Sequence, residues 1–240
     1  MNIIITGASR GIGKAIAKRF AENGWNIVIN CDHSVEELNR TKFELEQSGA
    51  SVLAEAGDVG DFDFAKKITD ECIAKFGRVD ALVNNAGISY IGLLTEMRPD
   101  EWEKIVRTDL TSVFNMCHEV ARNMLHYHNG RILNISSVWG NVGASMEAAY
   151  SACKGGVNSL TKALGKELAP SGISVNAIAC GAIDTKMNAC FNKEEIDALV
   201  DEIPYCRMGK AEEVAELAYS VITGPSYLTS QVITLDGGWI

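Results

Sequence analysis

Short apolar runs alternate along the chain with longer segments in which apolar side chains recur every three or four positions. The apolar runs, each typical of a strand, cover residues 3–5, 26–30, 51–54, 81–83, 131–135, 174–179 and 231–235. The segments with helical periodicity cover residues 13–23, 35–48, 62–76, 99–127, 148–168 and 211–222. Continuous apolar strands that alternate with helices predict a parallel sheet covered by helices on both faces.

This pattern fills the chain without a break. The 240 residues contain no internal repeat, low-complexity tract or Pro/Ser-rich linker, and this length suits one domain with a large core. We therefore expect an α/β fold: a single doubly wound Rossmann-type domain over residues 1–240, with a central parallel sheet of about seven strands. The least regular stretch, residues 181–207, is a candidate for a segment that closes over a ligand.

Composition and charge exclude several classes of protein. The net charge of −9 argues against a nucleic-acid or anionic-membrane partner, because phosphate recognition needs a basic surface. No apolar run approaches the roughly 20 residues that span a bilayer. The first predicted strand begins near Met1, so we expect no signal peptide and a cytoplasmic protein. Seven cysteines without a CxxC pair favour reduced thiols and no metal site: Cys31, Cys72, Cys117, Cys153, Cys180, Cys190 and Cys206.

Three glycines crowd the junction between the first predicted strand and the first predicted helix. Gly7, Gly11 and Gly13 lie in the sequence Thr-Gly-Ala-Ser-Arg-Gly-Ile-Gly, residues 6–13. Glycine lets main-chain N–H groups approach a ligand, and the helix N-terminus that follows attracts a phosphate. Tight strand–helix turns also need glycine, and the spacing differs from GxGxxG, so the glycines alone leave both interpretations open.

A tyrosine and a lysine form a candidate acid–base pair. Tyr150 and Lys154 are four residues apart in a predicted helix and therefore share a face. A tyrosine with a pKa of about 10 is a poor acid–base catalyst at neutral pH, but a nearby ammonium lowers the pKa of the phenol. Ser137 follows an apolar strand thirteen residues upstream. The alternative is a Tyr–Lys pair on a solvated helix face.

These motifs occur together in one order. The TGxxxGxG turn is followed by Gly57-Asp58-Val59, by Asn-Asn-Ala-Gly at residues 84–87, and by Tyr150 with Lys154. Over essentially the whole chain this combination resembles the classical short-chain dehydrogenase/reductase family. The resemblance implies a nicotinamide dinucleotide across the carboxyl ends of the strands. The implied cofactor contacts are Gly7, Ser9, Arg10, Gly11, Ile12, Gly13, Asp32, Asp58, Val59, Asn85, Ala86, Gly87, Tyr150, Lys154, Ile183 and Thr185.

The resemblance also implies a mechanism, hydride transfer to a ketone with Tyr150 as proton donor. Ser137 would bind the carbonyl oxygen and Lys154 the nicotinamide ribose. Asp109 occupies a fourth catalytic position, where the family usually has Asn, and we expect its added charge to alter the titration of Lys154 and Tyr150. The family usually has Pro-Gly where this chain has Cys-Gly at residues 180–181, which predicts a more mobile loop entrance.

Asp32 and Arg10 give opposite indications of the cofactor. A carboxylate at the tip of the second strand favours NAD, because it accepts bonds from both ribose hydroxyls and repels a 2′-phosphate. In NAD-preferring relatives, however, the acid aligns with Cys31, one residue earlier. Arg10 matches the residue that helps neutralise the 2′-phosphate in NADP-using relatives. We therefore expect NADP(H) to be favoured, with NAD(H) possible.

Two subgroups of the family suggest two ketone substrates. Length and the segments 175–178 and 235–238 resemble bacterial 3-oxoacyl-acyl-carrier-protein reductases, although the expected docking segments 126–129 and 169–172 lack permanent positive charge. Residues 135–145 with Glu147 resemble elongation factor P 5-aminopentanone reductases, in which Glu147 could pair with a substrate ammonium. Glu147 could equally be a solvated carboxylate at a helix start. The expected substrate contacts are Ser137, Trp139, Glu147 and Gly181.

A third interpretation is a dinucleotide-binding regulator without catalysis. Such relatives typically lose the Tyr/Lys pair, which this chain keeps at Tyr150 and Lys154. The resemblance further implies a homotetramer, packed through segments 111–125 and 151–168 and the last strand. We expect a small-molecule or carrier-linked ketone as the partner of the site.

Overall fold

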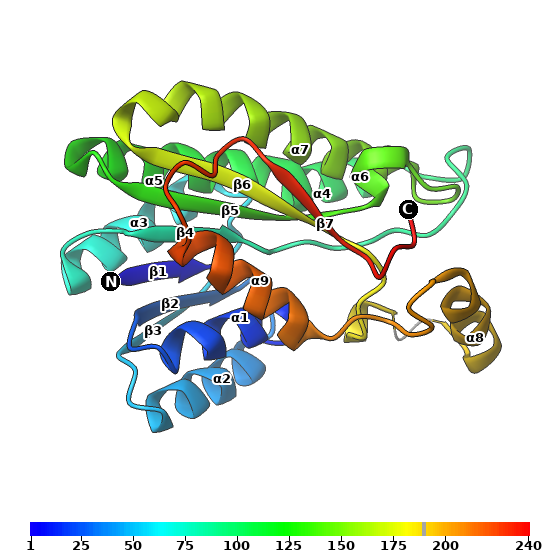
Figure 1. Cartoon of the computed structure of the whole chain (residues 1–240), viewed down its shortest axis with the longest axis horizontal. Helices are drawn as coiled ribbons and strands as arrows, with labels where there is room; N and C mark the ends of the chain where they lie inside the picture. The colour runs from blue at the N-terminus through cyan, green and yellow to red at the C-terminus, as the bar shows by residue number, and fades with distance from the viewer. Residues whose placement is uncertain (189–190) are drawn as a thin grey trace.

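The computed structural model, in which residues 1–188 and 191–240 are described, is a three-layer α/β/α sandwich (Figure 1). Its seven parallel strands lie in the order β3-β2-β1-β4-β5-β6-β7. The strands are β1 (Asn2–Ile5), β2 (Asn26–Cys31), β3 (Val52–Ala56), β4 (Ala81–Asn84), β5 (Gly130–Ser137), β6 (Ile173–Cys180) and β7 (Val232–Leu235). The prediction of a single doubly wound domain with about seven parallel strands is confirmed.

Helices cover both faces of this sheet (Figure 1). On one face lie α1 (Gly11–Ala21), α2 (Val35–Gln47) and α9 (Ala211–Thr223). The other face carries α3 (Phe62–Phe76), α4 (Pro99–Val106), α5 (Ser112–Tyr127) and α7 (Ala148–Leu168). Two further helices, α6 (Trp139–Val142) and α8 (Lys193–Glu202), lie beside the carboxyl ends of the strands.

The apolar core is divided into two layers by the sheet. Successive side chains of a strand point to opposite faces, so Ile3 and Ile5 pack with α1 and α9 while Ile4 packs with α3 and α5. Both layers are fully buried at these positions, which explains why each strand reads as a continuous apolar run in the sequence.

The structure corrects the predicted helices in three places. The segment 99–127 is not one helix, because a π-helical turn at Arg107–Thr111 separates α4 from α5. Periodicity of apolar residues does not reveal one widened turn. The short helix α6 was not predicted. Helix α8 forms inside the stretch regarded as least regular, where Asn192 and Glu195 build a capping box at its start.

The strand order places a crevice at the carboxyl edge of the sheet. β1 lies between β2 and β4, and the connections that leave β1 and β4 cross to opposite faces. Ligands of doubly wound sheets bind at such a reversal point. Residues that follow β1, β4, β5 and β6 therefore meet there.

Three observations concern membranes, metals and thiols. No helix in the described part of the chain is long and apolar enough to cross a membrane. Within the same residues, no group of three His, Cys, Asp or Glu side chains is placed to hold a metal ion. The six described cysteines are free thiols, whereas Cys190 and part of the segment 181–207 lie outside the described residues.

Candidate active site

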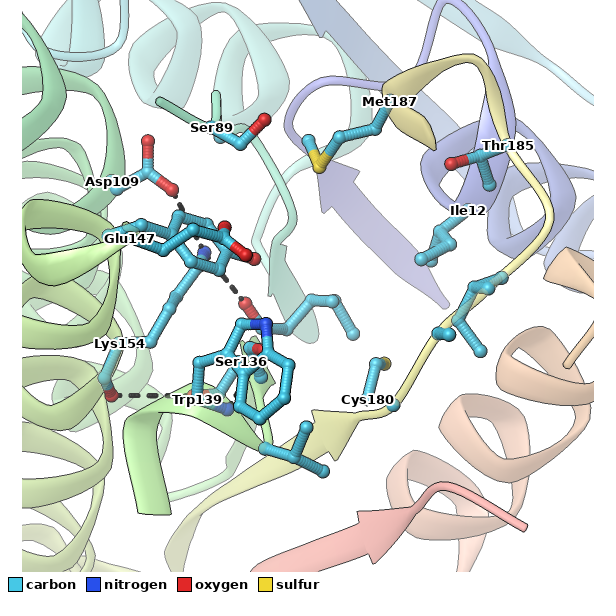
Figure 2. Close-up of a pocket in the computed structure, with 18 of the residues that line it drawn as sticks. Ile12, Ser89, Asp109, Ser136, Trp139, Glu147, Lys154, Cys180, Thr185 and Met187 are labelled. Carbon is cyan, nitrogen blue, oxygen red and sulfur yellow. Dashed lines mark hydrogen bonds and ion pairs between the residues drawn. The ribbon is translucent and has the colours of Figure 1, made fainter. Parts of the chain in front are cut away.

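An open cavity lies at the carboxyl ends of β4, β5 and β6 (Figure 2). Ser137 is the last residue of β5 and Cys180 the last residue of β6, and both line this cavity. Figure 2 shows Asp109, Glu147 and Lys154 on one side of the cavity and Ile12, Thr185 and Met187 on the other. The cavity therefore lies between the α7 side of the sheet and the segment that follows β6.

The structure brings most of the predicted site residues to this cavity. The predicted catalytic and substrate residues line it: Asp109, Ser137, Trp139, Glu147, Tyr150, Lys154 and Gly181. Five predicted cofactor residues line it as well: Ile12, Asn85, Gly87, Ile183 and Thr185. The other predicted cofactor residues do not line it: Gly7, Ser9, Arg10, Gly11, Gly13, Asp32, Asp58, Val59 and Ala86.

The glycine turn packs directly against the end of β4. Gly7 has a φ of +63°, and a Cβ there would come within 2.8 Å of the Ala86 Cα. A Cβ on Gly13 would come within 2.5 Å of both the Asn85 amide nitrogen and the Gly7 carbonyl oxygen. Contacts within the protein therefore exclude a side chain from Gly7 and Gly13, whether or not a ligand is bound.

Asn85 and Thr6 lock this contact with four hydrogen bonds. The Thr6 hydroxyl oxygen accepts from the main-chain N–H groups of Asn85 and Ala86, each at 3.0 Å. The Asn85 side-chain amide donates to the carbonyl oxygens of Thr6 at 2.9 Å and Gly7 at 3.0 Å. The Asn-Asn-Ala-Gly segment thus fixes the path of the β1–α1 turn.

The start of α1 has the features of a phosphate-binding helix terminus. Arg10 is its N-cap residue and makes no side-chain cap hydrogen bond. The first-turn N–H groups of α1 therefore have no side-chain acceptor, and they carry the positive end of the helix dipole. Such a terminus, beside a turn that excludes side chains, fits the diphosphate of a dinucleotide.

Two cations meet one carboxylate near the end of β2. The Arg10 guanidinium lies 2.8 Å from one Glu37 oxygen, and the Lys186 ammonium lies 2.7 Å from the other. Hydrogen bonds from these two cations hold the pKa of Glu37 below its usual range. Asp32 is exposed, and one of its carboxylate oxygens lies 2.9 Å from the His33 Nε2. The acid at the strand tip thus already has a neighbouring partner.

Asp58, predicted to lie near an adenine, binds groups of the chain itself. One carboxylate oxygen accepts from the Gly60 N–H at 2.7 Å, and the other accepts from the Arg107 guanidinium at 2.7 Å. Val59 is buried, and its carbonyl oxygen accepts from the Asn115 amide at 3.2 Å. These contacts join the loop after β3 to the π-helical turn and to α5.

Lys154 is buried beside Tyr150 rather than solvated. Its side chain is one turn along α7 from Tyr150, and its Nζ lies 5.4 Å from the centre of the tyrosine ring. The same Nζ lies 3.2 Å from an Asp109 carboxylate oxygen and donates to the Ile135 carbonyl oxygen at 3.3 Å. Only 5% of Lys154 is exposed. The solvated-face alternative for the Tyr–Lys pair is therefore wrong.

The protonation of this pair depends on burial as well as on charge. Burial has the largest effect on the pKa of Tyr150 and raises it, whereas the ammonium of Lys154 lowers this pKa and the charge of Asp109 raises it, as expected from the sequence. The net pKa of Tyr150 is therefore raised. Burial lowers the pKa of Lys154, but the charges of Asp109 and Tyr150 outweigh burial and raise it. Both side chains therefore hold their protons at neutral pH.

Two indole rings and a carboxylate line the cavity together. Glu147 is the N-cap residue of α7, but its side chain makes no cap hydrogen bond and lines the cavity instead. Burial raises the pKa of Glu147, against the effect of a hydrogen bond from Trp139. The rings of Trp139 and Trp239 meet edge to face, with centroids 4.9 Å apart.

Trp239 is a cavity residue that sequence reasoning missed. Its indole N–H donates to a Glu202 carboxylate oxygen at 3.2 Å, so it connects the C-terminal segment to α8. Gly181, at the entrance of the loop after β6, donates its N–H to the Leu235 carbonyl oxygen at 2.9 Å. The only sequence signal for Trp239 was its place just after the Leu-Asp-Gly-Gly segment, residues 235–238.

Comparisons with known proteins agree with this fold and this site. The family profile described as short chain dehydrogenase matches residues 1–196. The chain therefore belongs to the short-chain dehydrogenase family, and it is an oxidoreductase.

Individual relatives cover almost the whole chain. It is 38% identical to the 3-oxoacyl-acyl-carrier-protein reductase of Staphylococcus aureus, over 98% of this chain and 96% of that protein. It is 39% identical to the enzyme of the same name from Synechocystis, over 99% of this chain and 96% of that protein. A crystal structure of a variant actinorhodin polyketide ketoreductase with NADPH has a TM-score of 0.95 and 34% identity, covering 99% and 96% of the two chains.

Proposed function

We propose that this chain is an NADPH-dependent ketone reductase of the 3-oxoacyl-acyl-carrier-protein type. The observation that carries the proposal is the convergence of Ser137, Tyr150 and Lys154 on one cavity at the carboxyl edge of the sheet. The names of the curated relatives, 38% and 39% identical over nearly the full chain, support a 3-oxoacyl thioester as substrate. The retained Tyr–Lys pair gives no support to a regulator without catalysis.

In this proposal the substrate ketone is bound by two hydroxyl groups. The carbonyl oxygen accepts hydrogen bonds from Ser137 and Tyr150, which both line the cavity. A bound reduced nicotinamide supplies the hydride that reduces the carbonyl carbon. Tyr150 donates its proton to the carbonyl oxygen as negative charge develops there, and its raised pKa keeps it in the protonated form that a general acid requires.

Lys154 has an electrostatic role in the same step. After proton donation Tyr150 carries a negative charge in a buried site, where an unpaired charge is costly. The ammonium of Lys154, 5.4 Å from the ring centre, offsets this charge. The contact of Lys154 with the Ile135 carbonyl oxygen holds the amine on the cavity side of β5.

The residues that would hold the cofactor extend from the cavity to the end of β2. The glycine turn and the uncapped start of α1 fit the diphosphate. Asn85, Gly87, Ile183 and Thr185 would flank the nicotinamide half. Arg10 and Lys186, the two cations gathered at Glu37, favour NADPH over NADH because a 2′-phosphate adds negative charge near them. NADH remains usable in this proposal, with lower efficiency.

A substrate panel tests the proposal. Acetoacetyl thioesters, amino-ketones and sugars are each incubated with the purified protein and either NADPH or NADH, and cofactor oxidation is followed by absorbance. We expect the highest kcat/KM for the acetoacetyl thioester with NADPH. The rate of cofactor oxidation measured with the Tyr150→Phe variant is the background, and it is subtracted. Turnover of other ketones without any thioester turnover would contradict the 3-oxoacyl assignment.

Glu147 supports a second candidate, reduction of the 5-aminopentanone-modified lysine of elongation factor P. That substrate carries an ammonium away from its ketone. A half-buried carboxylate next to the Trp139 and Trp239 rings offers the groups that bind an ammonium, by charge and by cation–π contact. An empty site leaves the Glu147 carboxylate with a raised pKa, which a bound ammonium would lower.

The Glu147→Gln variant separates the two candidates. If the carboxylate binds a substrate ammonium, the KM for a 5-amino-ketone rises while the KM for a neutral ketone of equal length stays the same. The effect of one partly buried ion pair is about 1.5–3 kcal/mol, or roughly 10- to 150-fold in KM. An unchanged KM for the amino-ketone would remove this candidate.

A further inference from the structure

Asp109 and Lys154, which Figure 2 shows on one side of the cavity, form a cluster of titratable side chains with Tyr150. Asp109 is completely buried and Lys154 is 5% exposed. The Lys154 ammonium lies 3.2 Å from the Asp109 Oδ2 and 5.4 Å from the centre of the Tyr150 ring. Because water is largely excluded, charge on any one of the three acts strongly on the other two.

The two carboxylate oxygens of Asp109 have different surroundings. Oδ1 accepts from the Ile88 N–H at 2.8 Å, a bond that the oxygen of an asparagine would make equally well. Oδ2 faces Lys154 and has no hydrogen bond of good geometry from the residues that the structure describes. A Cβ on Gly87 would lie 2.8 Å from this Oδ2, so the chain closes over the oxygen. In an asparagine at position 109, a neutral NH₂ group would take the place of Oδ2 and would face Lys154.

The π-helical turn explains how Asp109 reaches this place. Arg107–Thr111 forms one widened turn between α4 and α5, and Asp109 is its buried residue. A widened turn shifts the side-chain direction relative to a regular helix, and such turns frequently occur at functional sites. The carboxylate is thereby held against α7, across from Lys154.

Glu147 also lines this cavity, three residues before Tyr150, and burial raises the pKa of its carboxyl. The other groups around the cluster are neutral. Cys153 on α7 and Cys180 on β6 are both buried, which raises the pKa of Cys153 to about 11 and that of Cys180 to about 12. The Ser137 hydroxyl and the Ile135 carbonyl oxygen on β5 carry no charge. The charges that act most strongly on Tyr150 are those of Lys154 and Asp109.

We propose that Asp109 is a positioning residue that acts through Lys154, neutralising the ammonium so that Tyr150 remains the proton donor to higher pH than an asparagine at this position would allow. This role rests on the proposed function, in which Tyr150 is the general acid. With Asp109 ionised, the Asp–Lys pair is neutral overall and the phenol keeps its proton. With an amide there, the uncompensated ammonium favours the phenolate.

The sign of the pH effect follows from this charge balance. Ketone reduction needs the phenol, so its rate falls as the pH rises through the pKa of Tyr150. Alcohol oxidation needs the phenolate, so its rate rises through the same pKa. Removing the charge of Asp109 lowers the pKa of Tyr150. The fall of the reduction rate and the rise of the oxidation rate, which are the two limbs of the pH profiles, then both move to lower pH by the same amount. A neighbouring charge shifts a pKa by about 1–3 units, and we expect a shift of that size.

The test compares the pH profiles of kcat for the wild type and Asp109→Asn in both directions. Asp80→Asn is the matched control, because Asp80 is also a buried carboxylate but precedes β4 at the opposite edge of the sheet. We expect a shift of both limbs to lower pH in Asp109→Asn and none in Asp80→Asn. Unchanged limbs, or limbs that move to higher pH, would overturn the proposal.

A titration without cofactor or substrate separates this proposal from the proposed function. The phenolate absorbance of each protein is recorded against pH, and the curve of the matching Tyr150→Phe variant is subtracted. We expect the Tyr150 phenolate to appear at lower pH in Asp109→Asn than in the wild type, whatever ketone the enzyme reduces. If Asp109→Asn does not fold, Asp109→Ser removes the same charge and replaces it in the titration; a Tyr150 phenolate that appears at the same or higher pH than in the wild type would overturn the proposal.

Discussion

The Asn85 side-chain amide lies so close to Gly13 that a Cβ on this glycine would come within 2.5 Å of the amide nitrogen. Asn85 holds its position through two donated hydrogen bonds to the carbonyl oxygens of Thr6 and Gly7. The first turn of α1 and the end of β4 are therefore fitted to each other before any ligand is bound. The third glycine of the motif is required by this contact.

We predict that Gly13→Ala lowers the free energy of unfolding by about 1–3 kcal/mol, the usual effect of overpacking a close-packed contact. The new methyl group would have to displace the Asn85 amide or the Gly7 carbonyl, each 2.5 Å from it. Urea denaturation followed by circular dichroism measures the change. Gly155→Ala in α7 is the control, because its Cβ would meet only the Gly140 carbonyl oxygen at 3.5 Å. Equal stability of Gly13→Ala and the wild type would contradict the contact.

Most of the fold could be predicted from the sequence, because buried parallel strands are apolar throughout. All seven predicted strands exist, and their ends differ from the prediction by up to two residues. The helices α3 and α7 have the predicted bounds, since Asp61 caps α3 and a continuous apolar stripe marks α7. The π-helical turn and α8 could not be predicted, because one is a single widened turn and the other buries none of its residues.

The candidate site was predictable in its members and less so in its electrostatics. Spacing placed Tyr150 and Lys154 on one helix face, and the structure brings both to the cavity with Ser137. The net direction of the Tyr150 pKa depends on burial and on Asp109, which spacing alone does not supply. Trp239 reaches the cavity only because the chain folds back after β7 toward α6 (Figure 1). The expected homotetramer and the cytoplasmic location stay predictions.

We predict that Tyr150→Phe lowers kcat for ketone reduction by roughly 10²- to 10⁴-fold, the range of a lost general acid. The ring remains to fill the wall of the cavity, so the Kd of the dinucleotide stays unchanged. Steady-state kinetics and fluorescence titration with NADPH measure the two quantities. A variant that keeps wild-type kcat would refute Tyr150 as the proton donor. A variant that loses dinucleotide binding as well would indicate a structural effect instead.

We predict that Arg10→Ala raises the KM for NADPH and leaves the KM for NADH nearly unchanged. The Arg10 guanidinium is partly exposed and lies beside Ser34 and Glu37, just after β2. A charge-assisted hydrogen bond contributes about 1.5–3 kcal/mol, which corresponds to roughly 10- to 150-fold in KM for NADPH. Initial rates at varied concentrations of each cofactor test this.

The control for this experiment is Lys14→Ala. Lys14 is a cation on the same helix, but it pairs with Glu44 on α2 at 2.7 Å, away from the end of β2. A general loss of positive charge would affect both variants equally, whereas a specific 2′-phosphate contact affects only Arg10→Ala. An equal rise of KM for NADH and NADPH in Arg10→Ala would show that Arg10 does not distinguish the cofactors.

We predict that Trp239→Ala raises the KM for ketones with long substituents and changes the KM for short ones little. Trp239 meets Trp139 edge to face at 4.9 Å and donates to Glu202 on α8, so it forms the part of the cavity wall contributed by the C-terminal segment. An aromatic contact of this kind contributes about 0.5–1.5 kcal/mol, or roughly 2- to 13-fold in KM. Because the hydrogen bond and the ring contact of Trp239 go to Glu202 and Trp139, and not to Tyr150 or Lys154, kcat for the short ketone should be retained.

Two further variants assign this effect to the ring of Trp239. Tyr227→Ala removes a ring that is 99% exposed in the same C-terminal region, and it should leave the KM for every ketone unchanged. Glu202→Gln keeps an oxygen that accepts from the indole N–H, so it should behave as the wild type if the hydrogen bond matters and the charge does not. An equal rise of KM for short and long ketones in Trp239→Ala would mean that the ring supports the whole cavity rather than the part of its wall contributed by the C-terminal segment.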